Sequence, residues 1–125
     1  MALDVDSFKK AKKLVCELIS GVRFFKIGLE VISSGFAPEL IKYIKRKKGK
    51  VFYDAKLSDI PKTVGEATKV ISRLRVDMIS VHASAGRKSI EEAVRNKHKS
   101  KIIGVTVLTS MDNAECKSIF GNNVD

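Results

Sequence analysis

The chain has no tryptophan, only two prolines and two cysteines, and few aromatic residues of any kind. The cysteines, Cys16 and Cys116, lie far apart and outside any CxxC motif, so we expect free thiols and no disulfide framework. No apolar run approaches the roughly 20 residues that span a bilayer, and Asp4 and Asp6 interrupt any signal-peptide pattern at the N-terminus. These absences predict a cytoplasmic protein with no membrane partner.

Acidic residues are also scarce, because 14 aspartates and glutamates face 24 lysines and arginines, which gives a formal net charge of +10. Such an excess suggests nucleic-acid binding, but the lysines cluster on the outer faces and C-terminal ends of expected helices, where they favour solubility and suit the helix dipole. With 6% aromatic residues and no zinc-finger or RNP-like pattern, the chain shows no means of reading bases. We therefore expect no nucleic-acid partner.

What the chain does have is 44% hydrophobic residues over 125 positions, enough for the core of one domain at most. Apolar runs typical of strands alternate with segments of helical spacing. The expected strands are 2–5, 22–29, 51–55, 77–82 and 102–108. The expected helices are 8–19, capped by Asp6 or Ser7, then 38–48, 60–74, 88–96 and 113–120.

Strand and helix alternate five times with short connections, and the strands are nearly continuous apolar runs, as in a sheet buried on both faces. This pattern predicts a parallel α/β fold, either a TIM-type (β/α)8 barrel or a doubly wound sheet. The barrel is favoured because its active site lies at the carboxyl ends of its strands, where this chain has Asp4, Lys26, Asp54, Lys56, His82, Thr109 and Ser110. A doubly wound sheet would more often show a Gly-rich loop after its first strand.

The most informative segment is 54–63, where Asp54 and Asp59 flank Lys56 as the third strand turns into a helix. In a regular strand Asp54 and Lys56 are two residues apart, so we expect their side chains on the same face. At the mouth of a βα unit, such a cluster can hold charge against a small anionic substrate. A lysine inside the apolar run 24–27, Lys26, also requires a polar partner at a buried strand end.

Structural roles remain open for these residues. The cluster could be a surface salt-bridge network with Asp59 as a helix N-cap. Asp4 could cap the first helix, and the pair 109–110 could cap the last one. His82 is expected to be a hydrogen-bonded structural residue. Because His82 and His98 are isolated and no Cys/His spacing fits, no metal site is predicted.

Five motifs of the chain, in order, resemble those of the orotidine 5'-phosphate decarboxylase family. They are Ala2-Leu3-Asp4, Phe25-Lys26-Ile27-Gly28, Asp54-x-Lys56-x-x-Asp59-Ile60-Pro61-x-Thr63, Val81-His82-Ala83-Ser84-Ala85-Gly86 and Val105-Thr106-Val107-Leu108-Thr109-Ser110-Met111. The DxKxxD element is shared with sugar-phosphate decarboxylases and hexulose-phosphate synthases of the same superfamily. The Ile60-Pro61-x-Thr63 extension and the Leu108-Thr109-Ser110 element favour the orotidine enzyme.

The resemblance implies a cofactor-free decarboxylation that converts orotidine 5'-phosphate to UMP in pyrimidine biosynthesis. Lys56 would protonate C6 as carbon dioxide leaves, and Asp54 would crowd the substrate carboxylate. Lys26 and Asp59 would complete the catalytic charge network. An ammonium between two carboxylates stays charged at neutral pH and remains a proton donor, and its field is set before the reaction begins.

The resemblance also implies a substrate-binding set, made up of Asp4, Lys26, Asp59, Ile60, Thr63, Thr109 and Ser110. Asp4 and Lys26 would contact the ribose hydroxyls, and the pair 109–110 would lie near the pyrimidine ring. The positions that match Asp59 and Thr63 reach into the neighbouring subunit's site in the family. The resemblance therefore implies a homodimer with shared active sites.

A (β/α)8 barrel needs about 200 residues or more, so we expect residues 1–125 to form a single partial barrel of about five βα units. The family's phosphate site, a mobile loop with a glutamine and a Gly-Arg pair, has no match in the chain. Because substrate binding energy from the phosphate supports catalysis, we expect poor stability and weak or no activity. The alternatives are a metal-using sugar-phosphate decarboxylase or hexulose-phosphate synthase and a non-catalytic half-barrel module.

Overall fold

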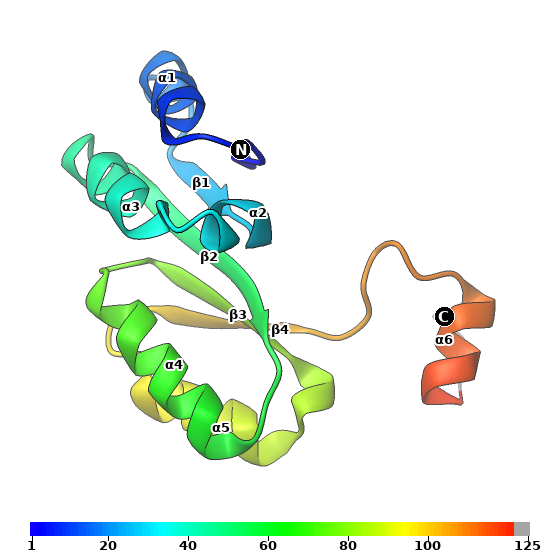
Figure 1. The fold of residues 1–125 in the computed structure, drawn as a ribbon. Helices are drawn as coiled ribbons and strands as arrows, with labels where there is room; N and C mark the ends of the chain where they lie inside the picture. The colour runs from blue at the N-terminus through cyan, green and yellow to red at the C-terminus, as the bar shows by residue number, and fades with distance from the viewer. Residues whose placement is uncertain (122–125) are drawn as a thin grey trace.

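The computed structural model describes residues 1–121 and contains one parallel sheet (Figure 1). Its strands, in spatial order, are β1 (Phe24–Ile27), β2 (Lys50–Leu57), β3 (Met78–His82) and β4 (Lys101–Val105). Each strand lies beside the one that precedes it in the sequence, so the order never reverses. A doubly wound sheet reverses at a switch point, whereas a barrel winds in one direction. The sheet therefore has the one-directional parallel order of a partial (β/α)8 barrel, in agreement with the predicted fold class.

Helices follow the strands along the chain. They are α1 (Phe8–Leu18), α2 (Leu29–Ser33), α3 (Ala37–Arg46), α4 (Pro61–Arg73), α5 (Arg87–Asn96) and α6 (Asn113–Phe120), with a short 3-10 turn, η1 (Ala83–Ala85). Figure 1 shows α3, α4 and α5 along one side of the sheet and α6 apart from it. Within residues 1–121, no helix has both the length and the apolar character needed to cross a membrane. Both cysteines are free, as expected.

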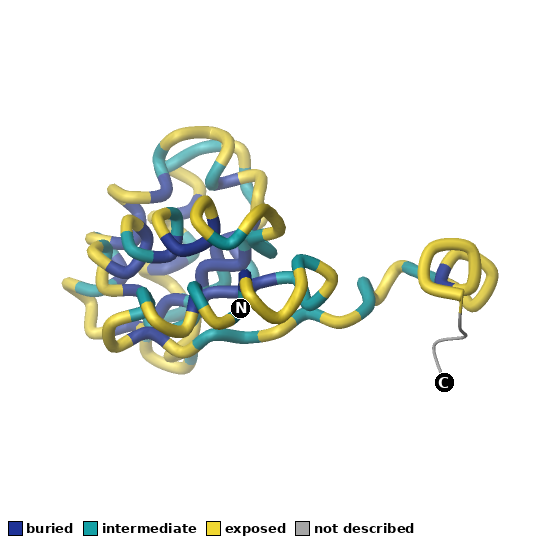
Figure 2. Tube along the Cα trace, turned by 90° about the horizontal axis from the view of Figure 1, so that it is seen from below, coloured by how far each residue is buried: buried dark blue, intermediate teal, exposed yellow. Residues whose placement is uncertain are grey.

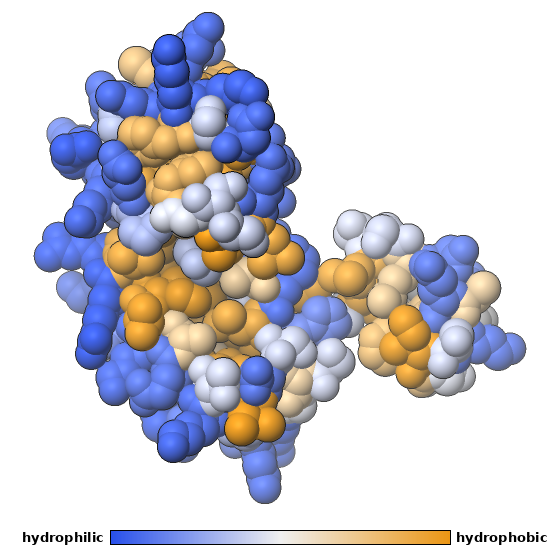
Figure 3. Space-filling model, viewed as in Figure 1, coloured by the Kyte–Doolittle hydropathy of each residue, from blue (hydrophilic) through white to orange (hydrophobic). Residues whose placement is uncertain are grey.

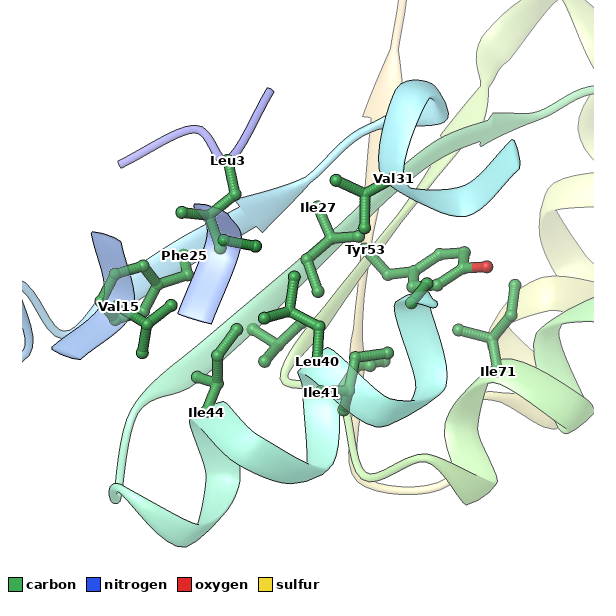
Figure 4. Close-up of a cluster of buried hydrophobic side chains, with 14 of the residues drawn as sticks. Leu3, Val15, Phe25, Ile27, Val31, Leu40, Ile41, Ile44, Tyr53 and Ile71 are labelled. Carbon is green, nitrogen blue, oxygen red and sulfur yellow. The ribbon is translucent and has the colours of Figure 1, made fainter. Parts of the chain in front are cut away.

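The main core lies between the sheet and the helices that cover it. Alternate strand residues such as Phe25, Ile27 and Val51 are fully buried and pack near the apolar stripe of α3, where Leu40 and Ile44 are also fully buried (Figure 4). Each such side chain stabilises the fold by about 1.5–3 kcal/mol. Figure 2 shows these buried positions concentrated in the sheet and in the inner stripes of the helices. A smaller cluster joins α4 and α5 to β3.

The opposite face of the sheet is only partly covered. Phe24 is 38% exposed, and Lys26, Phe52 and Met78 on the same face are partly exposed. Figure 3 shows hydrophobic side chains at the surface among charged ones on the face that it views. This face of the sheet therefore leaves apolar side chains partly uncovered.

The largest differences from the predicted elements concern two strands and one helix. The strand predicted at 2–5 is reduced to an isolated bridge between Ala2 and Lys26, because the chain leaves the sheet once the Leu3 N–H has bonded to the Lys26 carbonyl. The strand predicted at 102–108 ends at Val105, because its partner β3 ends at the opposite residue, His82. Helix α2 was not predicted, because five residues are too few to show a helical period. The sheet thus has four strands and one bridge.

The helix caps correct two structural alternatives. Ser7 caps α1, as expected, and its Oγ accepts a hydrogen bond from the Lys10 N–H, so Asp4 does not have this role. Helix α6 has the predicted bounds, but its cap is Asp112, whose carboxylate accepts a hydrogen bond from the Glu115 N–H at 2.9 Å. A capping role for residues 109–110 was therefore wrong.

Candidate active site

Four of the predicted site residues meet at the carboxyl ends of β1 and β2. Lys56 Nζ lies 2.9 Å from Asp54 Oδ2, and Lys26 Nζ lies 3.5 Å from the same oxygen. Lys26 Nζ also lies 4.0 Å from Asp4 Oδ1. The prediction that Lys26 requires a polar partner is confirmed, since one carboxylate joins lysines from two strands.

Asp54 is the buried centre of this cluster, and its side chain is 9% exposed, whereas those of Lys56 and Lys26 are 33% and 35% exposed. Burial raises the pKa of Asp54. Hydrogen bonds from Lys56 and Ser80 and the charges of the two lysines lower it further than burial raises it, so the pKa lies below its usual value of 3.8. Two ammonium groups face two carboxylates, Asp54 and Asp4, so the formal charges of the cluster balance at the rim.

Lys56 reaches Asp54 through an irregular strand. The pairing of β2 with β3 passes from Tyr53↔Ile79 to Leu57↔Val81, so residues 54–56 lie opposite a single residue of β3. Within this bulge Lys56 has φ 48°, in the left-handed region, which costs a non-glycine residue roughly 1–2 kcal/mol. Bulges near active sites redirect side chains in this way. The two side chains meet as predicted, but the predicted cause, alternation along a regular strand, was wrong.

Ser80 is a member of the cluster that the sequence analysis missed. It is fully buried on β3, where its Oγ accepts a hydrogen bond from the Lys56 N–H and donates one to Asp54 Oδ1, each at 2.8 Å. One signal was available: a serine in an otherwise apolar strand needs a partner for its hydroxyl.

Gly28 makes room for the outer part of the cluster. A Cβ atom at this position would lie 3.3 Å from Asp4 Oδ1 and 3.7 Å from Lys26 Nζ. A Cβ atom would therefore crowd Asp4 Oδ1, whereas its distance to Lys26 Nζ would be an ordinary contact, so the glycine gives Asp4 room where β1 ends.

Asp59 does not join the cluster within residues 1–121. Its Oδ1 accepts a hydrogen bond from the Ile60 N–H, and no ion pair of the described residues links it to Lys56. It is not the N-cap of α4 either, because that residue is Ile60, which makes no side-chain cap. Asp59, Ile60 and Thr63 are all exposed where β2 leads into α4.

The remaining predicted residues lie outside the cluster. Thr109 and Ser110 are exposed in the segment that leads from β4 to α6, away from the sheet (Figure 1). His82 Nδ1 lies 2.7 Å from Ser84 Oγ, so His82 is hydrogen-bonded, as expected.

A cavity of about 960 Å³ lies at the other end of the sheet, where Lys45, Asp77 and Lys101 are among its lining residues. It includes none of the predicted site residues. We keep the candidate site at the carboxyl ends of the strands, because the buried carboxylate and its two lysines lie there, and this end carries the chemistry in barrels. No three Asp, Glu, His or Cys side chains within residues 1–121 are placed to hold a metal ion.

The arrangement provides a fixed cation beside a buried anion. Lys56 is held by Asp54 yet remains one-third exposed at the rim, so a bound molecule could reach it. An ammonium in this position can stabilise developing negative charge and then donate a proton.

Comparison with known proteins gives these residues a context. A model of the orotidine 5'-phosphate decarboxylase / HUMPS family matches residues 1–125. The orotidine 5'-phosphate decarboxylase of Methylococcus capsulatus is 43% identical over 119 residues, which cover 95% of this chain and 48% of the relative. That of Carboxydothermus hydrogenoformans is 42% identical and covers 95% of this chain and 52% of the relative. The chain thus spans about half the length of the curated relatives that it matches.

Solved structures agree in fold. An uncharacterized conserved protein from Geobacillus kaustophilus superposes with a TM-score of 0.87 at 28% identity, over 98% of this chain and 61% of that protein. The orotidine 5'-monophosphate decarboxylase from Methanocaldococcus jannaschii superposes with a TM-score of 0.82 at 30% identity, over 95% of this chain and 57% of that protein. Each match leaves a large part of the longer protein uncovered.

Proposed function

The chain belongs to the orotidine 5'-phosphate decarboxylase / HUMPS family, and we propose that it carries the proton-donating part of an orotidine 5'-phosphate decarboxylase site. The observation that carries this proposal is the Lys56 ammonium, 2.9 Å from buried Asp54 at the end of β2. Residues 1–125 are inferred to form one partial barrel domain. The substrate is the nucleotide orotidine 5'-phosphate, and the products are UMP and carbon dioxide.

In this reaction the bond between C6 and the substrate carboxylate breaks, and its electron pair stays on C6. Lys56 and Lys26 stabilise the negative charge as it develops, because their positions are fixed before the substrate arrives. Asp54, which keeps its negative charge at neutral pH, repels the substrate carboxylate and favours its departure as carbon dioxide. Lys56 then donates its proton to C6.

The proposal includes a homodimer in which each subunit contributes to its neighbour's site. Asp59, Ile60 and Thr63 support it, because they are exposed at the rim and take no part in the chain's own charge cluster. Ile60 is 66% exposed, more than any other large hydrophobic residue within residues 1–121. In sedimentation, the chain should behave as a dimer and its Ile60→Glu variant as a monomer. A monomeric parent chain would contradict the shared site.

We also propose a cytoplasmic location, which the two free thiols favour.

The test of the activity is to give the purified chain orotidine 5'-phosphate and to measure both carbon dioxide release and binding of 6-hydroxy-UMP by calorimetry. We expect measurable binding with turnover far below that of a full-length relative, because the family's phosphate-binding elements have no match in the chain. Failure to bind 6-hydroxy-UMP would contradict the proposal. Magnesium-dependent turnover of a sugar phosphate would favour the alternative within the family.

A further inference from the structure

The bulge in β2 leaves a backbone group without its usual partner. The regular pairing of β2 with β3 is interrupted between Tyr53 and Leu57, so the Lys56 N–H cannot follow the ladder. Ser80 accepts this N–H at 2.8 Å, and it is the single β3 residue between the two paired positions Ile79 and Val81. Since an unpaired buried N–H costs roughly 1–3 kcal/mol, this side chain helps to maintain the bulge.

The number of protons available determines which atom donates and which accepts in the two hydrogen bonds of Ser80. A serine hydroxyl has one proton and two acceptor sites. The Lys56 N–H can only donate, so the hydroxyl accepts there, and its single proton goes to Asp54 Oδ1 at 2.8 Å. The Oδ2 atom of the same carboxylate is taken by Lys56 and Lys26. Asp54 therefore cannot rotate without losing a partner on one of its oxygens.

We propose that Ser80 is a positioning residue for the reaction: by holding the Lys56 backbone and the Asp54 carboxylate together, it sets where the Lys56 ammonium stands. A role of Ser80 in catalysis rests on the proposed function, but its role in positioning Lys56 and Asp54 does not. Ser80 touches neither lysine ammonium and needs no contact with substrate. It acts by joining β3 to both ends of the bulge, so that the proton donor and its counter-ion keep one arrangement.

The test compares Ser80→Ala with Ser80→Thr, which keeps the hydroxyl, and with Ser100→Ala. Ser100 is a matched control, because it is also buried and its Oγ donates to the Val76 carbonyl at 2.8 Å, at the other end of the sheet. In each variant, NMR follows the titration of the Asp54 carboxyl carbon and the exchange rate of the Lys56 amide proton. Turnover of orotidine 5'-phosphate is measured in the same samples.

Ser80→Ala should raise the pKa of Asp54, because a hydrogen bond to the carboxylate is lost, and should speed exchange of the Lys56 amide about tenfold. Ser80→Thr should restore both, and Ser100→Ala should change neither. Where turnover is measurable, kcat should fall about 10- to 100-fold in Ser80→Ala with KM little changed, as for a displaced catalytic group.

An unchanged Asp54 titration in folded Ser80→Ala would overturn the inference. If that variant does not fold, Ser80→Cys replaces it, since a thiol is nearly as small but a weak donor. It should shift the Asp54 titration in the same direction, and an unchanged titration there would overturn the inference too. A parent chain that neither turns over orotidine 5'-phosphate nor binds 6-hydroxy-UMP would count against the proposed function, whereas the titration and exchange data would still decide the role of Ser80.

Discussion

Two aspartates hold lysines at opposite ends of the same sheet, at nearly the same distance. At the carboxyl end, Asp54 lies 2.9 Å from Lys56 and also contacts Lys26 and the Ser80 hydroxyl. At the amino end, Asp77 lies 2.8 Å from Lys45 of α3, and the same oxygen accepts the Val51 N–H at 2.7 Å. The two ion pairs differ in what else the carboxylate binds.

This difference separates an ion pair that stabilises the fold, at Asp77, from one placed to take part in a reaction, at Asp54. Asp77 balances one lysine, and its second bond goes to the backbone, so it ties α3 to the starts of β2 and β3. Asp54 serves two lysines, and all of its partners are side chains, so it gathers charged groups from two strands at the rim. The lengths of the two pairs are nearly equal, but Asp54 is 9% exposed and Asp77 27%. The number of lysines that each carboxylate binds and the identity of its other partner also distinguish them.

The largest effect is expected on turnover, when the lysine of the Asp54 pair is removed. Lys56→Ala should lower turnover of orotidine 5'-phosphate by about 10²- to 10⁴-fold, because the proton donor is gone. Lys45→Ala removes the partner of Asp77 and should leave turnover, per folded molecule, unchanged. Carbon dioxide release by the two variants at matched folded concentration measures the difference. Equal losses would mean that the two lysines do not differ in function.

The next effect concerns stability, when the Asp77 pair is removed. Asp77→Ala should lower the free energy of unfolding by about 1–3 kcal/mol, because the Val51 N–H loses its acceptor in a partly buried position. Asp6→Ala is the control, since Asp6, just before α1, pairs with Lys10 at 2.9 Å with both side chains exposed, and such pairs contribute little. Urea unfolding should separate the two variants. If the urea midpoint of Asp77→Ala equals that of the parent chain, Asp77 does not stabilise the fold.

A smaller effect appears in the pH dependence of stability. Because the pKa of Asp54 is lower in the folded chain than its usual 3.8, the folded state binds fewer protons there than the unfolded state does. The stabilisation is complete above the usual pKa and is lost as the pH falls through the lowered one. Asp54→Asn cannot titrate, so its unfolding free energy should decline less steeply than that of the parent between about pH 5 and pH 1. Parallel curves would contradict this.

The elements and the four charged residues of the cluster could be predicted from the sequence because both depend on local patterns. Helical spacing gave the bounds of α6 and nearly those of α3 and α4. Polar residues at the ends of apolar runs identified Asp54, Lys56 and Lys26, since the carboxyl ends of parallel strands meet at one edge.

The features that were missed depend on pairing between distant segments. The bulge exists only in the register between β2 and β3, so neither the φ of Lys56 nor the partners of Ser80 could be derived from one segment. The end of β4 is likewise set by the length of its neighbour. The direction of the Asp59 carboxylate likewise depends on the turn into α4, where it accepts a hydrogen bond from the Ile60 N–H.

The smallest effect asks whether the backbone strain at Lys56 differs from strain elsewhere. Lys56 and Arg75 both lie in the left-handed region, with φ 48° and 61°, one in the bulge and the other after α4. Glycine tolerates this region, so Lys56→Gly should be more stable than Lys56→Ala, and Arg75→Gly more stable than Arg75→Ala, each by about 1 kcal/mol.

Each pair of variants lacks the same side chain, so the difference between glycine and alanine isolates the backbone. Equal differences in urea unfolding at the two sites would mean that the strain itself is ordinary. The two sites would then differ only in function. The left-handed backbone at Lys56 directs an ammonium group toward Asp54, whereas at Arg75 it only ends a helix. A larger difference at Lys56 would instead place additional strain in the bulge, held there by the two hydrogen bonds of Ser80. No difference at either site would show that positive φ is not costly in this chain.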